Sequence, residues 1–197
     1  MSKIAKKVWV NTLIKTAKYT SGWIEVASDI LSYEESPFEL AQLEEFNENQ
    51  LSIIRDAIKD NVNINLDKLA NKSLNATQMQ LYLLGISKGV PEEKMDTFLN
   101  PYIPYAKSNY IIQSMIEGND ELLKYIDFDV DQIYEIYAGM KDGIDYKVYA
   151  IKELRADTMS IARHCMNAGR AVEIYEDNTI VTKIPTEENV VESDVSE

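Results

Sequence analysis

The feature that most constrains this chain is a recurring spacing of glycine and small residues. Equivalent positions recur every 25 to 29 residues at Asn61, Gly89, Gly118, Gly143 and Gly169. Four residues before each of them lies a small side chain, at Ala57, Gly85, Ser114, Gly139 and Cys165. A period of this length is typical of repeat proteins, in which each unit is one supersecondary element.

Apolar residues before each small position follow the spacing of an α-helix. In the second unit Met79 and Tyr82 precede Gly85 at intervals of three, and Ile86 follows it. This pattern is one face of a helix. The helix is expected to end at the glycine position, where a left-handed backbone favours glycine and then asparagine.

Three of the expected helices have a capping box at their start. Asn47, Asn75 and Asp129 each precede a glutamine by three residues, at Gln50, Gln78 and Gln132. A short polar side chain at the first position can accept hydrogen bonds from the free amides of the first helical turn. The third and fifth units lack this pattern.

A second, shorter helical segment is expected after each glycine turn. The sequence therefore predicts an all-α fold, an array of about five helix–turn–short-helix repeats over residues 46–171 that stack to share a core. Residues 1–45 are interpreted as an N-terminal helical cap. Residues 172–184 alternate around Asp177-Asn178 and predict a small β-hairpin. Residues 185–197 are interpreted as an acidic disordered tail.

The repeat resembles one found in uncharacterised proteins of Firmicutes phages and mobile elements. The segments that carry the resemblance are Asn75 to Gly89, with Gln78-Met79, and Asp129 to Ala150, with Tyr149-Ala150. It implies an origin on a mobile element and a cytoplasmic location in a bacterial host. It transfers no active-site residues, because the shared positions are structural.

The chain shows no pattern of catalytic, cofactor-binding or metal-ligating residues. It has one histidine, His164, and one cysteine, Cys165. Neighbours on a helix point about 100° apart, so the two cannot act together as nucleophile and base. Cys165 is expected to fill a buried small position. We therefore expect a protein without enzymatic activity, cofactor or metal.

The net charge of −13 constrains the partner. Such a chain should repel nucleic acid over most of its surface and suits a partner protein with a basic surface. The alternative is that the acidity serves solubility alone. The basic segment 3–18 could touch a membrane or nucleic acid, or could simply cap the first repeat, which we favour. The densest acidic stretch is either a solvated helical face or a docking surface, and contains Glu34, Glu35, Glu39, Glu44, Glu45 and Glu48.

Two tyrosines are candidate anchors for a partner. Tyr134 occupies a position that is polar in the other units, where Ser52, Gln80, Asn109 and Ser160 stand. Tyr137 follows it on the same helix face. Tyrosine is favoured at the centre of interfaces, although such a pair could equally pack on a neighbouring helix.

These features lead to a non-enzymatic, acidic, protein-binding repeat protein. In its narrower form the hypothesis is an inhibitor of a host nucleic-acid-targeting defence system, of anti-CRISPR or antirestriction type, that occupies a basic surface without binding nucleic acid or membrane itself. The alternative is a homomeric structural or assembly protein of a virion or mobile element.

Overall fold

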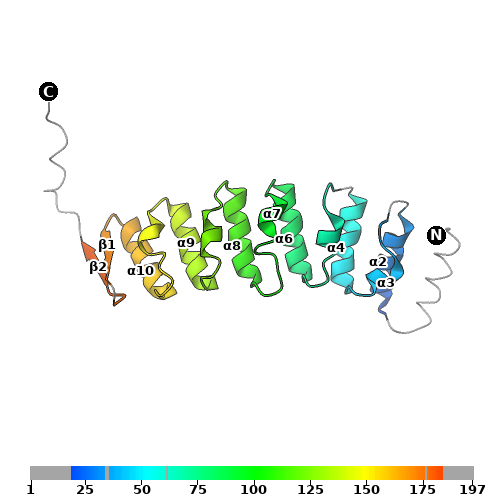
Figure 1. Ribbon diagram of the computed structural model, residues 1–197, viewed down its shortest axis with the longest axis horizontal. Helices are drawn as coiled ribbons and strands as arrows, with labels where there is room; N and C mark the ends of the chain where they lie inside the picture. Colours follow the sequence, from blue (N-terminus) through cyan, green and yellow to red (C-terminus); the bar gives the residue numbers. More distant parts are fainter. Residues whose placement is uncertain (1–18, 34–35, 61, 176, 184–197) are drawn as a thin grey trace, which may run out of the picture. The chain divides into compact units, whose positions relative to one another are not determined.

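The computed structural model describes residues 19–33, 36–60, 62–175 and 177–183. Within these ranges the chain is mostly helical, with one two-stranded antiparallel hairpin near the C-terminus (Figure 1). None of the helices in these ranges combines the length and apolarity needed to cross a membrane. The chain divides into two compact units, Met1–Tyr105 and Ala106–Glu197, and each is described by itself.

Unit 1 alternates long and short helices. The long ones are α2 (Ser21–Ser32), α4 (Glu48–Lys59) and α6 (Ala76–Ser87), and α4 packs against both α2 and α6. The short ones are α3 (Leu40–Leu43), α5 (Leu66–Leu69) and α7 (Glu92–Met95). The break in helical structure at Ser36-Pro37 lies between α2 and α3.

Unit 2 continues the alternation with shorter 3-10 segments and ends in the hairpin. Its elements are α8 (Tyr105–Ile116), which begins one residue before the unit, η1 (Glu121–Tyr125), α9 (Val130–Asp142), η2 (Tyr146–Val148), α10 (Ala156–Asn167), β1 (Ala171–Ile174) and β2 (Ile180–Lys183). The two strands pair in register from Ala171 with Lys183 to Ile174 with Ile180, as the alternating sequence predicted. The segments 3–18 and 185–197 lie outside the described residues.

The apolar face predicted from the sequence is the buried face of the long helices. Leu51, Met79, Ile111, Ile133 and Met159 are fully buried. The small positions Ala57, Gly85, Ser114 and Gly139 are buried as well. Cys165 is the exception: it is only half-buried, so the expectation of a buried thiol was wrong. The reason is its place on α10, after which no further long helix follows in the described residues.

Both predicted helix ends are observed. The Gln50 N–H donates to Asn47 Oδ1 at 3.0 Å, and Gln50 Oε1 accepts from the Asn47 N–H at 2.9 Å. The same reciprocal pair starts α6 and α9. At the other end Gly89, Gly118, Gly143 and Gly169 have φ between +70° and +84°. Asn61 lies outside the described residues.

The small position also takes part in the turn that ends each helix. Its carbonyl accepts the N–H of the residue after the glycine, as in Val90 to Gly85 at 2.9 Å and Ile144 to Gly139 at 3.2 Å. This closes the helix with a Schellman-type hydrogen bond. At Gly139 there is a second reason for a small residue, because a Cβ there would collide with the Tyr149 hydroxyl.

A hydrogen bond from the third helical residue, N3, links successive long helices. The Gln50 Nε2 donates to the Leu74 carbonyl at 2.6 Å, just before the N-cap of α6. Gln132 Nε2 donates to the carbonyls of Lys152 at 2.8 Å and Leu154 at 2.6 Å, and Leu154 precedes the N-cap of α10. Gln78 Nε2 donates to the Asn100 carbonyl at 2.9 Å. We call these contacts the N3 hydrogen bonds.

Two other residue types make the same contact where the sequence lacks glutamine. In α2 the Trp23 Nε1 donates to the Phe46 carbonyl at 2.9 Å, immediately before the N-cap of α4. In α8 the Lys107 ammonium donates to the Ile126 carbonyl at 3.0 Å and also to that of Phe128, which precedes the N-cap of α9. In α8, whose sequence lacks the capping box, a lysine is therefore the donor at N3.

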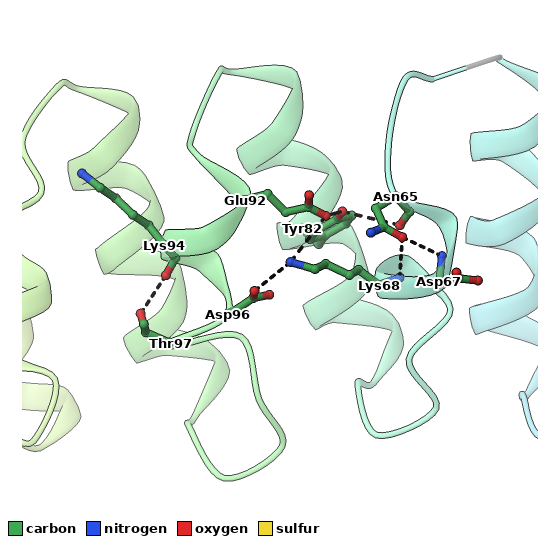
Figure 2. Close-up of polar contacts among 8 residues, drawn as sticks. All are labelled: Asn65, Asp67, Lys68, Tyr82, Glu92, Lys94, Asp96 and Thr97. Carbon is green, nitrogen blue, oxygen red and sulfur yellow. Dashed lines mark hydrogen bonds and ion pairs between the residues drawn. The ribbon is translucent and has the colours of Figure 1, made fainter.

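The short helices α5 and α7 are joined to α6 by a polar network (Figure 2). The Tyr82 hydroxyl from α6 donates to Glu92 at the start of α7. Lys68 of α5 forms an ion pair with Asp96 at 2.7 Å and approaches Glu92 at 3.9 Å. Asn65 accepts the Asp67 and Lys68 N–H groups and so caps α5. Burial, with the hydrogen bond to Glu92, raises the pKa of Tyr82.

Unit 2 has a related cluster centred on Glu121 of η1. Glu121 accepts a hydrogen bond from the Tyr146 hydroxyl of η2, and Lys124 and Lys147 lie 3.2 Å and 3.5 Å from its carboxylate. The Tyr146 hydrogen bond and the two lysines lower the pKa of Glu121 to about 2.

A pH dependence of stability follows from this cluster. The pKa of Glu121 is lower in the folded protein than in the unfolded chain, where it is about 4.3. The stabilisation that the Glu121 carboxylate gives to the folded state is therefore complete above about pH 4.3 and is lost as the pH falls toward about 2. Glu121→Gln should therefore lower the free energy of unfolding at neutral pH, and the difference from wild type should shrink between about pH 5 and pH 2. Denaturant unfolding across that range measures it, with exposed Glu153→Gln as the charge-matched control. A difference that is constant with pH contradicts the assignment.

Candidate protein-binding surface on α9 and α10

Three tyrosines meet where α8 and α9 pack. The ring of Tyr110 on α8 lies 5.6 Å from the ring of Tyr134 and 5.6 Å from that of Tyr137, both tilted. Such arrangements are favourable for aromatic pairs. Tyr134 nevertheless keeps 44% of its surface exposed, whereas Tyr137 is half-buried. The Tyr137 hydroxyl lies 3.4 Å from Glu117, and burial together with that carboxylate raises its pKa.

A nearly buried ion-pair network fixes α10 against α9. Arg163 Nε lies 2.8 Å from Glu135, and its Nη1 lies 2.9 Å from Asp142. The side chains of Arg163 and Glu135 are only 12% and 10% exposed. The Glu135 carbonyl also accepts the buried Tyr149 hydroxyl at 3.1 Å. Removing one partner would leave a buried charge, so the network holds both helices in one arrangement.

An open groove of about 630 Å³ runs over α9 and α10. Its floor and walls are made of residues from these two helices, namely Asp131, Tyr134, Glu135, Ala156, Asp157, Ser160, Ile161, His164 and Cys165. Three carboxylates and no lysine or arginine belong to this set. Apolar contact surface is offered by the ring of Tyr134 and the side chain of Ile161.

The polar side chains of the groove have defined neighbours. Asp157 pairs with Arg155 at 2.8 Å, and the hydrogen bond from Arg155 lowers the pKa of Asp157. His164 Nδ1 lies 2.6 Å from the Ser160 carbonyl. Asp131 is exposed at the second residue of α9 and has no ion-pair partner in the part of the chain that the structure describes. The arrangement suits recognition of a positively charged group beside an apolar one.

Ile161 is a surface residue that the sequence analysis missed. It is 56% exposed at the sixth residue of α10. The sixth residues of α4, α6 and α9 are Ile53, Leu81 and Glu135, and they are only 9%, 3% and 7% exposed. The described residues contain no further long helix after α10 that could cover this position.

The acidic stretch does not form one helical face. Glu34 and Glu35 lie outside the described residues. Glu39 precedes α3, Glu44 and Glu45 follow it, and Glu48 begins α4; all four are exposed. Glu45 pairs with Lys72 at 3.0 Å, and Glu48 accepts the Thr20 hydroxyl at 2.7 Å. These residues belong to unit 1, whereas Tyr134 and Tyr137 belong to unit 2.

Among the described residues, no three histidine, cysteine, aspartate or glutamate side chains gather closely enough to hold a metal ion. Comparison of the chain with protein-family models, curated proteins and solved structures finds no match.

Proposed function

We propose that this chain is a non-enzymatic helical repeat protein that binds a partner protein through the outer face of α9 and α10. The observation that carries the proposal is the pair of exposed apolar side chains beside the groove, Tyr134 at 44% and Ile161 at 56% exposure. Aromatic and aliphatic side chains next to a polar-rimmed groove are typical of protein-binding surfaces.

The repeat interpretation supports the proposal, because it separates the positions that hold the helices together from the outward positions that differ between repeats. Long and short helices alternate, and the glycine turn, the small position and the N3 hydrogen bonds recur at matching places. We include α2 and α3 in the series, because Trp23 makes the N3 hydrogen bond. The outward positions are left free for binding, as on other repeat proteins.

The charge supports a basic partner. With a net charge of −13, the protein attracts positively charged surfaces over a distance of about a Debye length, ~8–10 Å at physiological salt. The narrower proposal is an inhibitor of a bacterial nucleic-acid-targeting defence system that occupies a basic nucleic-acid groove, on a protein of phage or mobile-element origin. The repeat motif and the charge motivate it.

Affinity capture from a bacterial host lysate tests the binding face. Tyr134→Ala should lose a partner that the wild-type protein retains, since loss of an aromatic anchor commonly costs about 2 kcal/mol or more, roughly thirty-fold in affinity. The matched control is Gln80→Ala, the same outward position on α6, which should retain it. Identical capture by all three proteins contradicts the proposal, and a homo-oligomer that Tyr134→Ala dissociates would favour the assembly-protein alternative.

A second prediction concerns the role of acidity in the narrower proposal. Replacing Glu34, Glu35, Glu39, Glu44, Glu45 and Glu48 by glutamine should slow association with the captured partner more than it speeds dissociation, because exposed charges act mainly on diffusional encounter. Association rates measured at rising salt should fall steeply for wild type and less for the variant. Salt-insensitive binding that tolerates all six changes would show that the acidity does not mimic nucleic acid.

A further inference from the structure

We propose that the groove over α9 and α10 receives an arginine-bearing helix of the partner protein. The guanidinium would lie between Asp131 and the ring of Tyr134, and an aliphatic side chain one turn away would cover Ile161. This inference rests on the proposed function and names the chemistry of the partner.

The carboxylates that line the groove favour a positively charged group on the partner. The lining includes Asp131, Glu135 and Asp157 but no lysine or arginine. Glu135 is already paired with Arg163, and Asp157 with Arg155 at the rim. Asp131 remains as the exposed carboxylate toward which a new positive charge would be drawn.

The chemistry beside Asp131 favours arginine over lysine. Tyr134 is 44% exposed and lines the same groove. A guanidinium can stack on an aromatic face while it donates to a carboxylate, whereas an ammonium is a strongly hydrated point charge. An arginine therefore satisfies both neighbours at once.

The molecule already uses this contact between its own helices. Arg163, the eighth residue of α10, reaches two carboxylates of α9. Arg55, the eighth residue of α4, bonds Asp56 and lies 3.9 Å from Asp29 of α2. A guanidinium that meets carboxylates on the adjacent helix is thus a recurrent way to join helices in this fold.

The position of Ile161 indicates that the occupant is a helix. The sixth residue faces the next long helix where one is present, as Glu135 of α9 faces Arg163 of α10. On α10 the hairpin packs against the helix but leaves Ile161 largely exposed. A helix of a partner seated in the groove would bury this side chain, because Ile161 belongs to the groove lining.

Matched amphipathic peptides test the proposal by fluorescence anisotropy. A helical leucine/arginine peptide should bind the full-length protein, a leucine/lysine peptide of equal length should bind more weakly, and a leucine/glutamate peptide should not bind. Asp131→Asn should weaken binding of the arginine peptide about two- to five-fold, and Ile161→Ser about three- to ten-fold. All of these side chains are exposed, so the variants should fold.

Two control variants separate the groove from general acidity. Asp127→Asn removes the same charge from an exposed site outside the groove, and Val181→Ser removes an exposed apolar side chain from β2. Both should bind the arginine peptide as wild type does. Equal weakening by Asp127→Asn and Asp131→Asn, or equal binding of the arginine and lysine peptides, overturns the proposal.

Competition distinguishes this proposal from the proposed function. Saturating arginine peptide should displace a partner captured through Tyr134. A partner that still depends on Tyr134 but is not displaced overturns the arginine-helix proposal and leaves the proposed function intact. If no captured protein depends on Tyr134, the proposed function fails and this inference with it. If Ile161→Ser converts a dimer to a monomer in light scattering, a second copy covers the face and the proposal is wrong.

Discussion

The structure depends on one buried or half-buried hydrogen bond that recurs from helix to helix. A donor at the third residue of a long helix reaches a carbonyl near the start of the next one, as Gln50 reaches Leu74 and Gln132 reaches Leu154. The same glutamine closes the capping box of its own helix. A buried carbonyl without a partner costs about 1–3 kcal/mol, so each donor stabilises the segment that leads into the following helix. One side chain therefore both caps its own helix and contacts the segment that leads into the next helix.

This constraint explains why the candidate site lies on the outward face. The helix face that carries Ile133, Ile136 and Gly139 is committed to the core. The neighbouring positions Asp131 and Tyr134 lie outside this buried face and take no part in the capping box. The Glu135–Arg163–Asp142 network then keeps α9 and α10 in a fixed relation, which gives the groove between their outward residues a defined shape.

Sequence reasoning reached the features that depend on local chemistry. The caps at Asn47, Asn75 and Asp129, the left-handed glycines and the hairpin turn at Asp177-Asn178 each require particular residue types, so their positions were predictable. The N3 hydrogen bonds were not predicted, because the donors include an indole and an ammonium as well as glutamine amides and share only an N–H group. The exposure of Ile161 and Cys165 depends on which element packs against the outer side of α10, and periodicity does not report that.

The most direct test of the N3 hydrogen bonds is native-state amide hydrogen exchange on Gln132→Met, which keeps the side-chain size and removes the donor together with the acceptor of the α9 capping box. The variant should lose about 1–3 kcal/mol of unfolding free energy, because the buried Leu154 carbonyl loses its partner, and the first amides of α10 should lose protection. Gln80→Met, on the exposed face of α6, is the matched control. If Gln132→Met is no more destabilising than Gln80→Met, and exchange at the start of α10 is unchanged, the N3 hydrogen bond does not hold the next helix in place.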